Sequence, residues 1–186
     1  KIYKKIKNYK KKIKFVYQNK PLGTGDAILK AKNIISDKYF LMLLPDDLIM
    51  GTNCSKKMIN IHNKYKSSVM ASMKVEKKNV SRWGIFKVKK YLKNKNFLIN
   101  DVVEKPNIKS APSNNAVIGR YILPKKIFKY LRKQKKGKGD EIHVTDAIQS
   151  LILKKNIFIG HNFAGKYLDC GTMNGYINSS IKIFKS

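Results

Sequence analysis

A short apolar run followed by two acids decides the fold class of this chain: Tyr39-Phe40-Leu41-Met42-Leu43-Leu44-Pro45-Asp46-Asp47. An apolar run of this length that ends at a proline is typical of a buried β-strand, because a helix needs a longer segment. The carboxylates follow where α/β folds collect ligand-binding residues, at the carboxyl end of a strand. The segment therefore predicts a strand of an α/β sheet with a functional site directly after it.

Strand-like and helix-like segments alternate on both sides of this run. Besides the run itself, the expected strands are residues 13–18, 68–74, 84–88, 97–103, 116–123 and 157–163. The expected helices are residues 25–33, 53–65 with an Asn53 cap, 124–132 opened by Pro124, 145–153 with a Thr145 cap, and 174–184. Such alternation predicts an α/β domain with a mainly parallel sheet. Without a linker or an internal repeat, residues 1–186 are expected to form a single domain.

The charge of the chain suggests a second class of function. The net charge is +30, which suits a nucleic-acid-binding or membrane-surface protein. Only three of the 41 basic residues are Arg, although Arg is favoured for reading bases and clamping phosphates. The lysines are spread from end to end among many Asn and Ile, as an AT-rich coding sequence would produce. Compositional bias is the preferred interpretation, and a basic nucleic-acid-binding module is the alternative function.

Several other classes of protein and site are excluded by simple patterns. Hydrophobic residues make up 42% of the chain, which excludes a disordered protein. No apolar run approaches the ~18 residues of a membrane span, and no secretory pattern is visible. Cys54 and Cys170 form neither a disulfide framework nor a zinc pattern. We therefore expect a cytoplasmic protein without membrane contact. The histidines are scattered and are interpreted as solvated or locally bonded.

The few acids of the chain lie where a site is expected. Beyond Asp46 and Asp47, Glu104 follows the strand at 97–103 beside Lys105, and Asp169 follows an apolar pair. Mg²⁺ prefers carboxylate oxygens and phosphate, often with only one or two protein carboxylates. Asp46 and Asp169 are therefore candidates to share one ion, although an ordinary turn after Pro45 explains the first acids equally simply.

Two glycine-containing segments are weaker candidates for ligand binding. Gln18–Ala27 leads from an expected strand into an expected helix, and its glycines Gly23 and Gly25 would let the backbone approach a ligand. An ordinary strand–helix turn would use the same residues. Trp83, the only Trp, stands beside Gly84 and is interpreted as cover for the edge of the core.

Seven short segments occur in an order typical of one enzyme family. They are Gln18…Pro21-Leu22-Gly23-Thr24-Gly25-Asp26-Ala27; Leu43-Leu44-Pro45-Asp46-Asp47; Val80-Ser81-Arg82-Trp83-Gly84-Ile85; Val103-Glu104-Lys105-Pro106; Ala111-Pro112-Ser113-Asn114…Ile118-Gly119-Arg120-Tyr121; Gly139-Asp140-Glu141-Ile142…Thr145-Asp146-Ala147-Ile148; and Gly165-Lys166-Tyr167-Leu168-Asp169-Cys170-Gly171. Each is modest alone. Together they span nearly the whole chain, which resembles the bacterial UTP–glucose-1-phosphate uridylyltransferases.

The resemblance implies a Rossmann-like nucleotide-diphosphosugar transferase fold, with a mainly parallel or mixed sheet flanked by helices and the N-terminal part missing. Residues 1–186 would be the C-terminal two-thirds of one nucleotidyltransferase domain. The implied reaction is an Mg²⁺-assisted in-line attack of glucose 1-phosphate on the α-phosphorus of UTP, giving UDP-glucose and pyrophosphate. A homo-oligomer is also expected from the family.

The resemblance also assigns roles to single residues. Gln18, Gly23 and Gly25 would hold the uridine, and Asp46 and Asp169 would bind Mg²⁺. Asp47, Gly84, Glu104 and Lys105 would hold glucose and its phosphate. Asp46 and Lys105 would be the catalytic pair.

The chain departs from the family pattern in two places. Asp26 stands where the family has His, which puts an anion near the expected nucleotide site. The family's first strand and its G-x-G-T-R-x-x-P-x-T-K loop, which cradles the triphosphate, are absent. The expectation is therefore a fragment of a longer enzyme or a catalytically dead remnant, with low stability when isolated.

Overall fold

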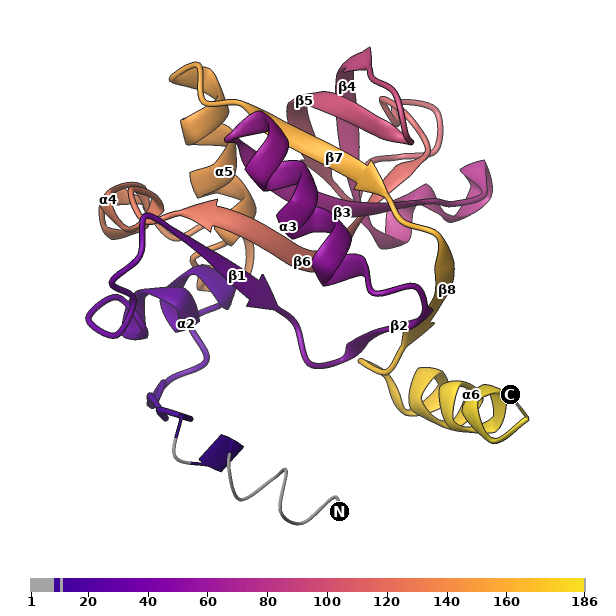
Figure 1. The fold of residues 1–186 in the computed structure, drawn as a ribbon, viewed down its shortest axis with the longest axis horizontal. Helices are drawn as coiled ribbons and strands as arrows, with labels where there is room; N and C mark the ends of the chain where they lie inside the picture. The colour runs from indigo at the N-terminus through magenta and orange to yellow at the C-terminus, as the bar shows by residue number, and fades with distance from the viewer. Residues whose placement is uncertain (1–8, 11, 186) are drawn as a thin grey trace.

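The computed structural model describes residues 9–10 and 12–185 as a mixed α/β fold (Figure 1). The strands are β1 (Tyr39–Leu43), β2 (Asp47–Gly51), β3 (Ser68–Lys74), β4 (Gly84–Tyr91), β5 (Asn96–Glu104), β6 (Asn115–Pro124), β7 (Phe158–Asn162) and β8 (Gly165–Asp169). The α-helices are α2 (Thr24–Lys30), α3 (Cys54–Tyr65), α4 (Ile127–Lys133), α5 (Val144–Leu153) and α6 (Met173–Phe184). Two short 3₁₀ helices, η1 (Lys77–Arg82) and η2 (Lys138–Asp140), complete the list.

Six strands form the central sheet in the order β1-β6-β3-β7-β5-β4. β6 is the longest strand and pairs with β1, β3 and, at one position, β4. Among the described strands only β3 and β7 run parallel, and the other neighbours are antiparallel. The mixed sheet flanked by helices is thus confirmed, whereas the expectation of a mainly parallel sheet is wrong for this part of the fold.

Helices cover both faces of the central sheet. α2, α4 and α5 enclose one apolar cluster that includes Phe86, Phe97 and Leu151, while α3 packs Cys54 and Met58 against the opposite face. Figure 1 shows α3 crossing one face, with α4 and α5 lying together beyond the end of β6. The apolar sides of these amphipathic helices supply the burial that holds the layers together.

A separate two-stranded sheet, β2–β8, extends beyond the main sheet, and α6 follows it at the lower right of Figure 1. The strands are antiparallel and pair Asp47 with Asp169. β2 and β8 are more than a hundred residues apart in the sequence, so no local sequence pattern predicts that they pair. This ribbon brings the acids after β1 to the acid at the end of β8.

Three predicted elements need correction. The run before Pro45 forms β1, but this strand lies at the edge of the described sheet and leaves Leu41 and Leu43 exposed, so the prediction that it is buried is wrong. Residues 13–18 have no regular structure, and Phe15 and Tyr17 are 78% and 83% exposed, because no described strand pairs with them. Pro124 ends β6 rather than opening a helix, and α4 begins at Ile127. β3 pairs with β6 only as far as Ile122, so the missing N–H of Pro124 costs no bond on that side.

The predicted caps give one success and one failure. Asn53 caps α3, since its Oδ1 accepts a hydrogen bond of 2.9 Å from the Lys56 backbone N–H. Thr145 does not cap α5, which begins one residue earlier at Val144 and follows His143. The Val144 N–H instead lies 3.4 Å from Oγ1 of Thr24, so a distant side chain meets the helix end. In the described residues, no helix is long and apolar enough to cross a membrane.

Candidate functional site

Asp47, the first residue of β2, is held by protein donors on every side. Its Oδ2 accepts a 2.6 Å hydrogen bond from the Gly119 N–H, and its Oδ1 accepts one from the Tyr167 hydroxyl. Its backbone oxygen accepts a 2.6 Å bond from Arg120. Burial raises the pKa of Asp47 despite the opposing hydrogen bonds from Tyr167 and Gly119. The carboxylate therefore ties β2 to the middle of β6 and to β8.

Gly119 makes the close contact between β6 and this carboxylate possible. A Cβ atom there would lie 2.6 Å from the Cβ of Leu44 and would also collide with Oδ2 of Asp47. The Gly119 carbonyl accepts a 2.7 Å bond from the Leu44 N–H. A side chain at this position would separate the turn after β1 from the sheet, so the geometry requires glycine.

Asp46 and Asp169 converge on the backbone of Gly171. A Cβ built on Gly171 would lie 2.8 Å from Oδ2 of Asp46 and 3.4 Å from Oδ1 of Asp169. The Cys170 N–H donates a 2.9 Å bond to the Asp46 carbonyl, and the Gly171 N–H donates a 3.0 Å bond to Oδ1 of Asp169. The two carboxylates that the sequence predicted would meet do lie on the same side of one turn.

This pair of carboxylates suits a hard divalent cation. Mg²⁺ takes oxygen ligands and usually keeps waters or binds phosphates alongside one or two protein carboxylates. No group of three or more His, Cys, Asp or Glu side chains in the described residues forms a closed metal site. The donor set therefore fits an ion completed by a substrate phosphate better than a permanent structural metal.

An aromatic bridge connects Asp47 to a second group of predicted residues. The Tyr167 ring meets Trp83 edge-on, with their centroids 5.5 Å apart. Trp83 precedes Gly84, which pairs across the β4–β5 ladder with Glu104. A Cβ on Gly84 would lie 3.0 Å from Oε2 of Glu104, so this carboxylate folds over the glycine. Trp83 also packs against two apolar clusters, which supports its interpretation as edge cover.

Lys105 and Tyr121 complete this second group. Lys105 has a φ of 44°, an uncommon conformation for a residue with a side chain, and its N–H donates a 3.0 Å bond to the Trp83 carbonyl. Tyr121 is buried, and burial together with the charges of Asp47 and Glu104 raises its pKa. Asp47 and Glu104 therefore both act on this buried phenol, which links the two groups beneath the surface.

The predicted nucleotide segment lies at the start of α2, and protein atoms already occupy its contacts. The Gln18 amide donates to the Gly23 carbonyl at 3.1 Å and to Oδ2 of Asp26 at 2.8 Å. Asp26 is 6% exposed and pairs with Lys30 at 3.3 Å. Its charge is thus neutralised by a neighbour and is not free to face a ligand.

Gly23 and Gly25 are glycines for a structural reason as well. Gly23 has a φ of 92°, which favours glycine, and a Cβ on either residue would come within 2.8 Å of the Ile142 backbone oxygen. The Gly25 N–H donates a 2.7 Å bond to that same oxygen. The backbones of Gly23 and Gly25 do approach another group closely, but that group is the protein segment before α5 and not a ligand.

The structure therefore brings the predicted residues together in two places. Asp46, Asp47, Gly84, Glu104 and Asp169 share one region, with Lys105 at its edge. The Gln18 segment leads into α2, where its residues Thr24 and Ala27 line a cavity of about 400 Å³ that extends to Pro45. The lining of this cavity is mostly apolar side chains of α2 and β1. The ligand-binding roles of the predicted residues in both places remain predictions.

Five residues that shape the first region were assigned no role from the sequence. They are Gly119, Arg120, Tyr121, Tyr167 and Gly171. All five lie within the quoted segments, so the ordered segments were the available signal. Arg82 was also missed, and its guanidinium lies 3.8 Å from Asp169 at the surface, where such pairs contribute little.

Comparisons with known proteins point in one direction. A family model described as nucleotidyl transferase matches residues 1–186. A UTP–glucose-1-phosphate uridylyltransferase from Pseudomonas aeruginosa is 35% identical over 161 residues, covering 85% of this chain and 57% of that protein. The chain thus spans a little over half the length of the curated relatives it matches.

Solved structures agree with the sequence matches. An apo UDP-glucose pyrophosphorylase superposes with a TM-score of 0.90 at 38% identity, covering 99% of this chain and 68% of that one. A UDP-glucose pyrophosphorylase complexed with UDP-glucose gives a TM-score of 0.85 at 38% identity, covering 92% of this chain and 66% of that one.

Proposed function

The chain belongs to the nucleotidyl transferase family, and from this premise we propose that its function is uridylyl transfer from UTP to glucose 1-phosphate, giving UDP-glucose and pyrophosphate. The observation that carries the proposal is the convergence of Asp46 and Asp169 on Gly171, in a fold similar to that of UDP-glucose pyrophosphorylases. Residues 1–186 would act as one domain in this reaction.

The chemistry requires positioning and charge neutralisation more than proton transfer. The nucleophile is a phosphate oxygen that is already anionic at neutral pH, so no strong general base is needed. Asp46 and Asp169 would hold Mg²⁺, which supplies neutralisation of phosphate charge when bound. Lys105 would neutralise the phosphate of the sugar substrate, and an in-line approach follows from holding both reactants in place.

The remaining residues would bind and orient the two substrates. The Glu104 carboxylate would accept hydrogen bonds from sugar hydroxyls, with the uncluttered backbone of Gly84 beside it. Asp47 would support the sugar side, and its bonds to Gly119 and Tyr167 favour a role in fixing the wall of the site. Gln18, Gly23 and Gly25 would face the uridine from the start of α2.

Location and assembly form a finer part of the proposal. Cys54 and Cys170 are both free thiols, which supports a cytoplasmic location. α6 exposes Tyr176, Ile177 and Ile181 by about half of each side chain, which supports a homo-oligomer that covers them.

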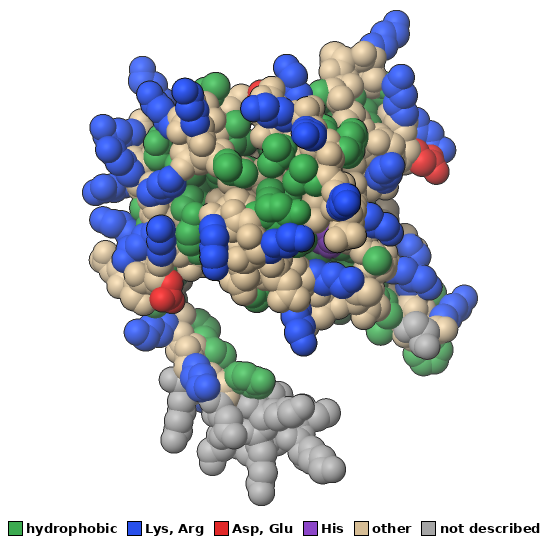
Figure 2. Space-filling model, turned by 45° about the horizontal axis from the view of Figure 1, so that its top comes forward, with side chains coloured by type: hydrophobic (Ala, Val, Ile, Leu, Met, Phe, Trp, Pro, Cys, Tyr) green, Lys and Arg blue, Asp and Glu red, His purple; other side chains and the backbone are tan. Residues whose placement is uncertain are grey.

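The positive charge on the face shown in Figure 2 gives no support to a nucleic-acid-binding function. Figure 2 shows Lys and Arg side chains scattered over the whole visible face, with apolar side chains between them. A groove or stripe that tracks a nucleic-acid backbone would gather these charges along one path. Compositional bias explains the charge, and a specific nucleic acid is not part of the proposed function.

The proposal is tested by measuring pyrophosphate release from UTP and glucose 1-phosphate with Mg²⁺. The assay uses the chain as given and the longest reading frame that contains it, each first shown to be folded by circular dichroism. Release that requires both substrates, together with UDP-glucose detected by chromatography, supports the proposal. If the folded full reading frame releases no pyrophosphate, the proposed activity is wrong and the chain is a decayed member of the family.

A further inference from the structure

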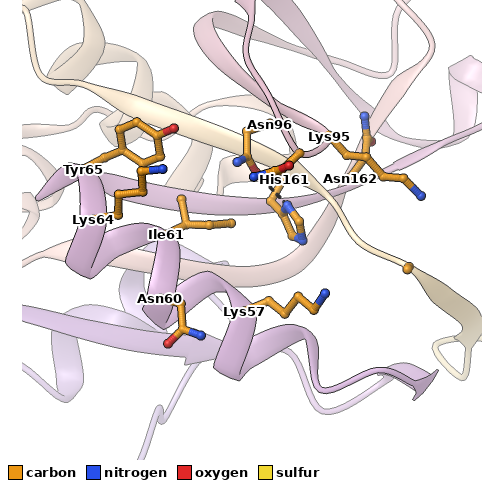
Figure 3. Close-up of a pocket in the computed structure, with 11 residues that line it drawn as sticks. Lys57, Asn60, Ile61, Lys64, Tyr65, Lys95, Asn96, His161 and Asn162 are labelled. Atoms are coloured by element: carbon orange, nitrogen blue, oxygen red, sulfur yellow. Dashed lines mark hydrogen bonds between the residues drawn. The ribbon is translucent and has the colours of Figure 1, made fainter.

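A cavity of about 530 Å³ opens on the face of the sheet covered by α3 (Figure 3). One wall is a single side of α3, where Lys57, Ile61 and Lys64 recur at helical spacing. The other wall is the start of β5 and the end of β7, with Asn96 and His161. None of the residues assigned to uridylyl transfer lines it.

The floor of this cavity contains a buried polar pair. Asn96 and His161 are 4% and 6% exposed, and Oδ1 of Asn96 lies 2.7 Å from Nδ1 of His161. An amide oxygen only accepts, so Nδ1 carries the hydrogen and Nε2 presents a lone pair. Burial and the charges of Lys57 and Lys95 lower the pKa of His161, which keeps the ring neutral near pH 7.

Two acceptors at this floor have no partner in the described part of the chain. They are Nε2 of His161 and Oδ1 of Asn162, both shielded from solvent. Leaving such a group unpaired costs about 1–3 kcal/mol, so buried acceptors usually have donors. Figure 3 shows the Lys57 side chain extending beneath the imidazole, so a ligand that draws this ammonium group toward itself would open the way to Nε2.

The rim of the cavity is cationic and contains no acid. Lys57, Lys64 and Lys95 line it, no Asp or Glu does, and none of the three is among the ion pairs of the described residues. Lysines alone carry no information in a chain with a net charge of +30. Their position around buried neutral acceptors is the informative feature, because a single molecule with a negative charge and hydroxyl donors would complement both.

We propose that this cavity is a second binding site, for a small phosphorylated sugar or polyol. The phosphate lies between Lys57 and Lys95, and the hydroxyl groups donate to Nε2 of His161 and Oδ1 of Asn162. Inorganic phosphate satisfies only the lysines, and an unphosphorylated sugar satisfies only the floor. The site is therefore selective for molecules that combine both groups, and it does not depend on the proposed transferase activity.

The test is isothermal titration calorimetry at 0.15 M salt with three probes: fructose 6-phosphate, inorganic phosphate and fructose. Charge-assisted hydrogen bonds are worth roughly 1.5–3 kcal/mol, so fructose 6-phosphate should bind at least about 10-fold more tightly than either other probe. Lys57→Ala combined with Lys95→Ala should weaken it at least about 10-fold. Lys129→Ala with Lys154→Ala, which removes the same charge from exposed positions on other helices, should change it less than about 2-fold.

A measurement on the unaltered protein keeps the test independent of any folding defect in the variants. The ¹⁵N resonance of His161 Nε2 should shift upfield with fructose 6-phosphate and stay unchanged with inorganic phosphate. The proposal is overturned if no probe binds saturably, if both double variants weaken binding equally, or if the Nε2 resonance ignores the sugar phosphate. Because no turnover is measured, a missing transferase activity leaves this result unaffected.

Discussion

Tyr167→Phe is the substitution that tests most sharply whether Asp47 organises the site. It removes one oxygen and keeps the ring that packs against Trp83. The lost bond is a hydroxyl donating to a half-buried carboxylate, and such bonds contribute about 1.5–3 kcal/mol. We expect the free energy of unfolding to fall by that amount in urea titrations. For a chain of this size the melting temperature should fall by about 2–4 °C for each kcal/mol.

The pH dependence of this loss identifies Asp47 as the partner. The hydrogen bond from Tyr167 favours the ionised carboxylate, so its contribution is full at neutral pH and declines as pH falls through the pKa of Asp47. Burial raises that pKa above its usual range, so the decline should begin above about pH 4. The difference between wild type and Tyr167→Phe should therefore be smaller at pH 4 than at pH 7.

Tyr91→Phe is the matched control for this prediction. Tyr91 is 62% exposed and its hydroxyl meets only the neutral amide of Asn115, at 3.3 Å. Its removal should cost less than about 0.5 kcal/mol and should not depend on pH. Equal losses in the two variants, or a Tyr167→Phe loss that is constant from pH 7 to pH 4, would refute the role given to Asp47.

Three further substitutions probe other parts of the account. Gly119→Ala should destabilise the fold by about 1–3 kcal/mol in urea titrations, because its Cβ would strike Leu44 and the Asp47 carboxylate. Asp26→Ala should reduce the preference for UTP over CTP, measured as the ratio of kcat/KM values. Asp26 accepts a hydrogen bond from the Gln18 amide NH₂ group, which leaves the Gln18 amide oxygen to accept from the imide N–H of uracil. Lys105→Ala should lower kcat/KM for glucose 1-phosphate by about 10–100-fold, since it removes charge from the proposed phosphate site.

Each of these predictions has a neighbouring control. Gly137→Ala meets only ordinary contacts of 3.4 Å or more and should leave stability within about 0.5 kcal/mol. Lys109→Ala removes a charge a few residues from Lys105 and should leave kcat/KM unchanged. An unaltered UTP to CTP ratio in Asp26→Ala, with Gln18→Ala as the positive comparison, would show that Asp26 does not orient the amide.

The predictable parts of the fold are those that depend on residues close together in the sequence. The Asn53 cap forms its hydrogen bond within a few residues, so sequence alone located it. The run before Pro45 was correctly predicted to be a strand, but β1 lies at the edge of the described sheet and is not buried. The acids at strand ends were found in the same way. Asp46 and Asp169 indeed converge, because the β2–β8 ribbon pairs Asp47 with Asp169 and the Cys170 N–H binds the Asp46 carbonyl.

The parts that were not predictable depend on residues far apart in the chain. The β2–β8 ribbon pairs segments that carry no strong strand pattern of their own, and its register alone places Tyr167 beside Asp47. The sequence around Gly119 does not show that glycine is required there. The requirement comes from the turn after β1, whose residues pack directly against it. Residues 13–18 failed for the converse reason, since a strand pattern gives no strand without a neighbour to pair with.

The central claim is that Asp46 and Asp169 together serve uridylyl transfer. It is tested most directly by initial rates of pyrophosphate release from the full reading frame carrying Asp46→Asn, Asp169→Asn or, as an exposed control, Asp37→Asn. The account predicts that the first two lose at least about 100-fold in kcat at saturating substrates with unchanged thermal unfolding, while the control keeps the wild-type rate. Rates within about 2-fold of wild type in either of the first two variants would contradict it.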